Sequence, residues 1–116
     1  MRPFAYSRPN DISSAVSLGS REAGTKFLGG GTNLVDLMKM GVEHPAHLVD
    51  ITRLPLAGIE EKADGVRIGA CARNSEVAAH PLIARRYPLI SQALLSGASP
   101  QIRNVATVGE IGRAHV

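Results

Sequence analysis

Cysteine and aromatic residues are scarce in this sequence. Its 116 residues contain one cysteine, no tryptophan, two phenylalanines and two tyrosines. A single cysteine can form neither an internal disulfide nor a cysteine-rich metal site. With so few aromatic rings the core must be aliphatic, and the sequence offers no aromatic platform on which single-stranded bases would stack. We therefore expect no nucleic-acid partner.

Long hydrophobic runs are also missing. The segment Met1–Tyr6 lacks the apolar stretch of a signal peptide, and no later segment approaches the roughly 18 apolar residues that span a bilayer. These absences predict a cytoplasmic protein with no membrane partner. Export to the periplasm together with a partner stays open.

What is present is the composition of a globular domain. Hydrophobic residues make up 44% and charged residues 20% of the chain, which suits one domain, or part of one, with a packed core. The net charge of +3 is spread along the sequence and indicates a solvated surface. The pair Arg85–Arg86 is interpreted as an exposed helix end, with a partner-docking patch as the alternative.

The first half of the chain predicts a strand, helix, strand pattern. We expect a helix from Ile12, capped by Asn10 or Asp11, and a second helix capped by Thr32 or Asn33 and ended by Gly41. A crossover of this kind implies parallel, buried strands. The expected strands are 4–6, 26–28 and 47–51, and the second helix is 34–40.

The second half predicts a β-hairpin followed by helices. Asp64–Gly65 is typical of a type I′ turn between strands 58–62 and 66–70. A helical region capped by Asn74 or Ser75 should break at Pro81 and Pro88, and residues 101–108 suit a surface-lining loop. The fold class expected is α/β (α+β): a small, mainly parallel sheet, a β-hairpin and flanking helices.

The glycine run Gly29–Gly31 is the segment that predicts chemistry. Three glycines between a strand and a helix allow neighbouring backbone N–H groups to converge on one anion, which favours a phosphate. Thr32 can add a hydroxyl and Asn33 an amide. We expect the amides between Leu28 and Leu34 to be free to bind a diphosphate; a tight turn with no ligand is the alternative.

Two known nucleotide loops fit this segment poorly. A P-loop needs Lys followed by Ser or Thr after its second glycine, and Lys39 lies too far along the helix. A dinucleotide fingerprint would accept Gly29 and Gly31 but needs a small residue where Leu34 stands. Asp50 lies at the distance of a ribose-binding carboxylate, although a cap at the strand end explains it equally well.

The other polar residues indicate neither a metal site nor a catalytic site. His44 and His47 are interpreted as surface-loop histidines, so we expect no metal site. Cys71 should be a small buried thiol. No catalytic residue is assigned to this chain, and we expect Glu60, Glu61 and Asp64 in the hairpin to face solvent.

Two longer motifs carry a family resemblance. Residues 26–39 read KFLGGGTNLVDLMK and residues 97–109 read GASPQIRNVATVG. Together they resemble the FAD-binding subunit of molybdenum hydroxylases, most closely the middle subunit of bacterial xanthine dehydrogenase and aldehyde oxidoreductase complexes. The resemblance covers residues 1–109, which would be the N-terminal part of a PCMH-type FAD-binding domain.

The resemblance implies FAD as the cofactor. Residues 26–34 would wrap its pyrophosphate, and Thr107 and Gly109 would meet its flavin side. Arg103 and Asn104 would either contact FAD or hold the loop through backbone hydrogen bonds. The implied cofactor-binding residues are Lys26, Phe27, Leu28, Gly29, Gly30, Gly31, Thr32, Asn33, Leu34, Arg103, Asn104, Thr107 and Gly109.

The resemblance also implies partners. The family's flavoprotein subunit works in an oxidoreductase complex with a molybdopterin-binding large subunit and a 2Fe-2S small subunit. It takes electrons that reach it through the iron-sulfur clusters, and substrate oxidation takes place on another chain.

The family pattern ends at Gly109. Residues 111–116 resemble a translated sequencing adapter, so we expect 110–116 to be a non-native tail on a truncated chain. Such a chain would be inactive alone and would bind FAD weakly or not at all. Two alternatives stay open: a Rossmann-like NAD(P)-binding domain, and an inactive fragment that only docks to partner subunits.

Overall fold

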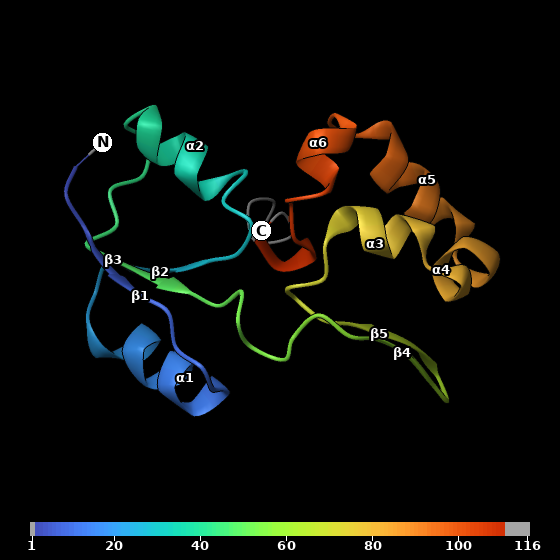
Figure 1. Cartoon of the computed structure of the whole chain (residues 1–116), viewed down its shortest axis with the longest axis horizontal. Coiled ribbons are helices and arrows are strands. Elements are labelled where there is room, and N and C mark those ends of the chain that lie inside the picture. Colours follow the sequence, from blue (N-terminus) through green and yellow to red (C-terminus); the bar gives the residue numbers. More distant parts are fainter. Residues whose placement is uncertain (1, 111–116) are drawn as a thin grey trace.

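The computed structural model describes residues 2–110, which form two lobes (Figure 1). The first lobe holds a three-stranded sheet in the order β1-β3-β2 with two helices. The second lobe holds a hairpin and four helices. The first-lobe elements are β1 (Ala5–Ser7), α1 (Ile12–Arg21), β2 (Thr25–Leu28), α2 (Leu34–Lys39) and β3 (His47–Asp50). Those of the second are β4 (Ile59–Lys62), β5 (Gly65–Ile68), α3 (Asn74–Ala79), α4 (Pro81–Arg86), α5 (Pro88–Ser96) and α6 (Pro100–Arg103).

The central strand β3 organises the first lobe. It pairs in parallel with both β1 and β2, as the crossover pattern predicts. Its side chains alternate between two buried faces: Leu48 packs with Leu34 and Met38 of α2, and Val49 packs with Ala15 of α1. The two helices therefore cover opposite faces of the sheet (Figure 1).

The helix ends agree only partly with the sequence. Asp11 caps α1 by accepting a hydrogen bond from the Ser14 amide at 2.7 Å, as expected. Asn33 precedes α2, but its side chain makes no capping hydrogen bond, so the predicted side-chain cap is wrong. The amides at this helix start have a different acceptor, which belongs to the site described below.

The hairpin is confirmed, but its turn is not the one expected. Lys62 pairs with Gly65, so the turn residues are Ala63 and Asp64 rather than Asp64 and Gly65. Within residues 2–110, Ala98 is the one non-glycine residue with positive φ. A type I′ turn requires positive φ at both central residues, and the prediction is therefore wrong.

The helices of the second lobe break at the predicted prolines. Pro81 and Pro88 open α4 and α5, where a missing N–H costs no hydrogen bond. The start of α3 differs, because the extended Arg73 is its N-cap residue and Asn74 already lies in the helix. The core of this lobe is formed by Ala72, Val77 and Ile83.

Residues 100–110 return the chain to the first lobe. The segment predicted as a loop begins with the short helix α6, whose start is capped by Ser99 accepting from the Ile102 amide at 3.2 Å. Thr107 then forms an antiparallel bridge with Arg73. The red end of the described chain consequently lies between the two lobes (Figure 1).

The surface of the second lobe agrees with the sequence. Arg85 and Arg86 lie exposed in the last turn of α4, and Arg86 pairs with Glu61. The side chains of Glu60, Glu61 and Asp64 are exposed. None of the helices within residues 2–110 is both long and apolar enough to cross a membrane.

Candidate functional site at the glycine loop

The glycine loop joins β2 to α2 at the carboxyl edge of the parallel sheet. Gly31 has φ +83°, a conformation that L side chains rarely adopt. The loop faces the segment 105–110 from the second lobe. The site therefore forms where two parts of the chain distant in sequence meet.

The amides of the loop converge on one anion, and that anion is the carboxylate of Glu110. Oε1 accepts hydrogen bonds from the amides of Gly29 at 3.0 Å and Gly31 at 3.1 Å. Oε2 accepts from the amides of Asn33 at 3.0 Å and Leu34 at 3.4 Å. Convergence is thus confirmed, but the expectation of free amides is wrong, because a side chain 76 to 81 residues away occupies them.

Two glycines let the segment 105–107 lie directly on the loop. A Cβ on Gly29 would overlap the Thr107 hydroxyl. A Cβ on Gly30 would overlap the Val105 carbonyl oxygen and lie 2.8 Å from its carbon. A carbonyl group cannot rotate away as a side-chain tip can, so a side chain at Gly30 would push the two segments apart.

Two threonine hydroxyls at the loop lack partners. The Oγ1 atoms of Thr32 and Thr107 are buried, and neither has a hydrogen-bond partner within the described residues. Thr107 is 4% exposed, and it lines the two cavities that Gly29 also lines. A buried hydroxyl without a partner is costly, so these atoms are suited to a ligand with hydrogen-bonding groups.

A polar cavity of about 380 Å³ adjoins the loop. Two arginines, Arg8 and Arg73, line it from opposite lobes and give it positive charge. The remaining lining residues are Gly29, Gly30, Thr52, Asn104, Val105 and Thr107. The cavity has the charge and the hydrogen-bond donors to hold an anion larger than a carboxylate.

Neither arginine was identified from the sequence. Arg8 follows β1, and the carboxyl ends of parallel strands meet at one sheet edge, so the predicted pairing of β1 could have indicated it. Arg73 reaches the loop through its bridge to Thr107. No local sequence pattern signals that bridge.

Asp50 is the last residue of β3, and its hydrogen bonds fix the end of the sheet that faces this cavity. Its carboxylate accepts hydrogen bonds from the Thr52 amide at 2.9 Å, the Thr52 hydroxyl at 2.6 Å and the Tyr6 hydroxyl. It also pairs with Arg8 at 3.5 Å. These contacts match the strand-end cap interpretation of Asp50 and leave no free carboxylate oxygen for a ribose.

The environment of Asp50 favours its charged form. Burial acts to raise its pKa, but the hydrogen bonds from Thr52 and Tyr6 and the charge of Arg8 outweigh burial, so the pKa lies below its ordinary value. The hydrogen bond to Asp50 raises the pKa of Tyr6. Asp50 is therefore an anion that positions Arg8 at the cavity.

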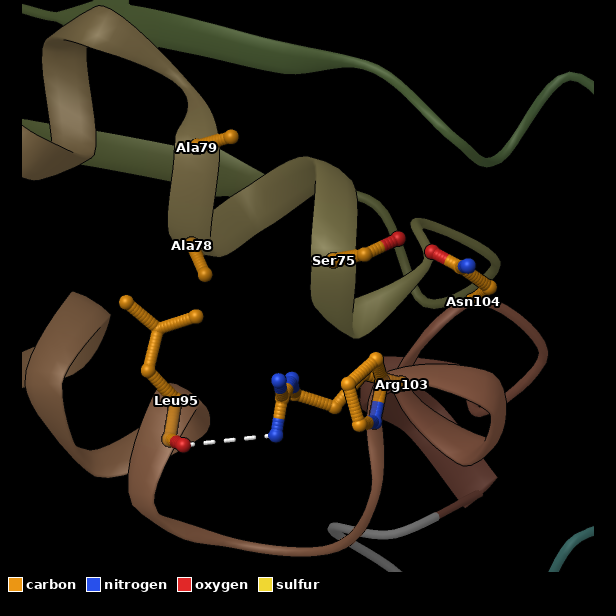
Figure 2. A pocket seen from close by; sticks show the side chains of 7 residues that line it. Ser75, Ala78, Ala79, Leu95, Arg103 and Asn104 are labelled. Carbon is orange, nitrogen blue, oxygen red and sulfur yellow. Dashed lines mark hydrogen bonds between the residues drawn. The ribbon is translucent and has the colours of Figure 1, made fainter.

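Arg103 holds the turn between α5 and α6. Its Nη1 donates to the carbonyl oxygens of Leu95 at 3.3 Å, Gly97 at 2.9 Å and Ala98 at 2.9 Å. Figure 2 shows the guanidinium reaching toward the Leu95 carbonyl, at a cavity of about 210 Å³. This geometry matches the loop-holding alternative for Arg103. Asn104 lines both this cavity and the one at the glycine loop.

Several other predicted site residues have side chains engaged elsewhere. Lys26 pairs with Glu43 at 3.6 Å, and the Phe27 ring lies against Gly19. Leu28 and Leu34 pack in the core beneath α2. Phe27 also lines a cavity of about 140 Å³ together with Gly29, Thr107 and Gly109. Gly109 is packed against Ala70, to whose carbonyl its amide donates at 2.8 Å.

His47, His80 and Cys71 have structural contacts, and the interpretation of His47 as a surface-loop histidine is wrong, because His47 is the first residue of β3 and is half-buried. The His47 ring hydrogen-bonds Ser7 at 2.8 Å, and His80 accepts from the Leu82 amide at the start of α4. Burial, with the nearby charge of Asp50, raises the pKa of the Cys71 thiol. Among residues 2–110, no group of three or more His, Cys, Asp or Glu side chains is placed to hold a metal ion.

These features define an α/β domain with a main-chain anion-binding loop beside a basic cavity. The chain belongs to the family described as the FAD binding domain in molybdopterin dehydrogenase, whose model matches residues 2–114. FAD is the cofactor of that family, as the resemblance implied. The match favours the flavin over the NAD(P) alternative.

Known relatives agree with this assignment. The chain is 49% identical over 108 residues to the aldehyde oxidoreductase FAD-binding subunit PaoB of Escherichia coli, covering 92% of this chain and 34% of the relative. It is 37% identical over 115 residues to the carbon monoxide dehydrogenase medium chain of Hydrogenophaga pseudoflava, covering 97% of this chain and 40% of the relative. The chain thus spans 34% to 40% of the length of these relatives.

A solved structure confirms the predicted fold class. Reconstituted CO dehydrogenase from Oligotropha carboxidovorans superimposes with a TM-score of 0.90 at 34% sequence identity. The match covers 93% of this chain and 38% of that chain.

Proposed function

We propose that the glycine loop binds the diphosphate of FAD, and that the whole protein is the FAD-binding electron-transfer subunit of a molybdenum-dependent oxidoreductase. The observation that carries this proposal is the convergence of the amides of Gly29, Gly31, Asn33 and Leu34 on one carboxylate. A carboxylate and a phosphate both present negatively charged oxygens to N–H donors. The donor set that holds Glu110 therefore fits a phosphate group.

The hydrogen bonds of the loop alone leave little net free energy for retaining a cofactor. Hydrogen bonds to a charged group contribute about 1.5–3 kcal/mol each, whereas association costs an estimated 4–15 kcal/mol. The adjoining cavity supplies further contacts: the guanidinium groups of Arg8 and Arg73 and the amide of Asn104. The hydroxyls of Thr32 and Thr107 gain partners if a ligand reaches them.

The other contacts that FAD needs would come from the rest of the proposed enzyme complex. FAD, when bound, supplies a carrier that accepts electrons and passes them on. The relatives' names describe FAD-binding subunits and medium chains of oxidoreductases. We therefore propose that this protein has two partners, a molybdopterin-binding large subunit and a 2Fe-2S small subunit. The chain would then be one part of an enzyme complex whose substrate chemistry lies on the large subunit.

Thr107→Val tests the site. Titration of FAD into the ¹⁵N-labelled chain, followed by NMR, is expected to shift the amide signals of Gly29, Gly31 and Asn33 even if binding is weak. Valine replaces a buried unpartnered hydroxyl with a methyl group, so stability should stay equal or rise. FAD affinity should fall about five- to tenfold through loss of one hydrogen bond.

Thr25→Val is the matched control. Thr25 also has a buried hydroxyl without a partner in the described part of the chain, but it lies at the amino end of β2, away from the loop. It should leave FAD affinity unchanged. Equal FAD affinity of the Thr107→Val chain and the unaltered chain would contradict the assignment of Thr107. Loop signals that stay unmoved while FAD shifts other amide signals would contradict the proposed function.

A further inference from the structure

We propose that Arg73 selects a diphosphate over a single phosphate, by holding the second phosphate in the cavity beside the glycine loop. This inference rests on the proposed function, in which the loop amides bind one phosphate. It starts from the cavity of about 380 Å³ that Gly29 and Gly30 of the loop line. Arg8 and Arg73 line the same cavity, which therefore offers space and positive charge beyond the loop itself.

The charge of Arg8 is already compensated. Its Nε lies 3.5 Å from Oδ2 of Asp50, and its Nη2 donates to the Thr52 hydroxyl at 3.3 Å. Asp50 is ionised near neutral pH, because its pKa lies below the ordinary value. Arg8 therefore meets the cavity as one half of an ion pair and adds little net charge to it.

Arg73 has no such counter-ion. Among residues 2–110, no carboxylate forms an ion pair with its side chain, which is exposed. A guanidinium carries a planar fork of N–H donors that matches two oxygens of one phosphate. Arg73 consequently supplies the uncompensated positive charge of this cavity, in the form best suited to a phosphate.

The backbone holds Arg73 beside a second unsatisfied donor. Arg73 and Thr107 form an antiparallel bridge, and the neighbouring Asn74 amide donates to the Ala106 carbonyl at 2.8 Å. Thr107 is 4% exposed and lines the cavity, and its buried hydroxyl has no hydrogen-bond partner within the described part of the chain. Residues opposite each other in such a bridge place their side chains on one face. One bound phosphate would give both groups a partner.

This division of the site predicts a preference. A single phosphate on the loop amides has no need of Arg73, whereas a diphosphate extends from the loop into the cavity. The site should therefore bind pyrophosphate more tightly than phosphate. For the same reason it should favour FAD, which has two phosphates, over flavin mononucleotide, which has one.

The ratio of pyrophosphate affinity to phosphate affinity tests the selection. NMR titrations of the ¹⁵N-labelled full chain with inorganic pyrophosphate and with inorganic phosphate would follow the amide signals of Gly29 and Gly31. Arg73→Gln should weaken pyrophosphate binding about tenfold through loss of a charge-assisted hydrogen bond, and should change phosphate binding by less than about twofold. The ratio cancels changes that affect both anions alike.

Arg73→Lys and Arg85→Gln are the matched variants. Lysine keeps the charge without the planar fork, so it should restore part of the lost pyrophosphate affinity. Arg85 is exposed in the last turn of α4 and does not line the cavity, so its substitution removes the same charge and should leave the ratio unchanged. Urea unfolding should give equal stability for the unaltered chain and both Arg73 variants, because no ion pair is lost.

The outcomes separate the two proposals. An unchanged ratio in Arg73→Gln would overturn the selection by Arg73 while leaving the phosphate-binding loop intact. An equal fall of the ratio in Arg85→Gln would reduce the effect to net charge and overturn the selection as well. Loop signals that neither anion moves in the unaltered chain would overturn the loop as a phosphate site, and the selection with it.

Discussion

Gly30→Ala is expected to abolish detectable FAD binding and to destabilise the chain. The added Cβ would overlap the Val105 carbonyl oxygen. Because that oxygen belongs to the main chain, no change of side-chain rotamer can remove the overlap. The glycine loop and the segment 105–107 must separate, which costs about 1–3 kcal/mol as overpacking does elsewhere. NMR titration with FAD would report the binding, and urea unfolding would report the free energy of unfolding.

Gly65→Ala is the control for this substitution. A Cβ at Gly65 meets no heavy atom within 4 Å, so neither stability nor FAD binding should fall. If Gly30→Ala behaved like Gly65→Ala in both measurements, the close packing of Val105 on the loop would be incorrect.

Asp50→Asn is expected to destabilise the chain by about 1–3 kcal/mol near neutral pH, because the hydrogen bonds to a buried, charged acceptor would be weakened or lost. Asp50 is 7% exposed and accepts from Thr52 and Tyr6. An asparagine keeps one acceptor oxygen and turns an NH₂ group toward the remaining donors. Arg8 would also lose its anionic partner at the cavity.

The effect of Asp50→Asn should depend on pH. The folded-state pKa of Asp50 lies below its ordinary value, so the carboxylate contributes stability above the unfolded-state pKa of about 3.9 and loses it as pH falls through the folded-state value. The difference in unfolding free energy between Asp50→Asn and the unaltered chain should therefore shrink in acid. The control Asp64→Asn, in the exposed hairpin turn, should show no such dependence. A difference that stayed constant through the acid range would contradict the role of Asp50.

The parallel sheet and the glycine loop could be predicted because their signals are local. Apolar strands on either side of Gly29–Gly31, with a helix between them, dictate a crossover and a loop of bare amides. The cap at Asp11 and the helix breaks at Pro81 and Pro88 are likewise decided by neighbouring residues. Each of these features follows from backbone chemistry within one or two turns of chain.

Features that depend on distant contacts could not be predicted. The hairpin turn is set by the register that pairs Lys62 with Gly65, which the dipeptide Asp64–Gly65 does not reveal. Arg73 gains its place at the cavity through a bridge to Thr107. Such pairings are decided by packing across the chain.

Glu110 is the clearest case. Its carboxylate accepts from the loop amides, a contact across 76 to 81 residues that the sequence did not predict, and its place in a non-native tail stays a prediction. Residues 111–116 of that tail lie outside the described residues. The sequence pattern identified a loop able to bind an anion, but not the anion that this chain itself supplies.

A crystal structure of the Glu110→Ala chain with FAD bound would test the central claim most directly. The account predicts diphosphate oxygens within hydrogen-bonding distance of the amides of Gly29, Gly31, Asn33 and Leu34. A diphosphate bound elsewhere, with these four amides making no contact to it, would contradict the account.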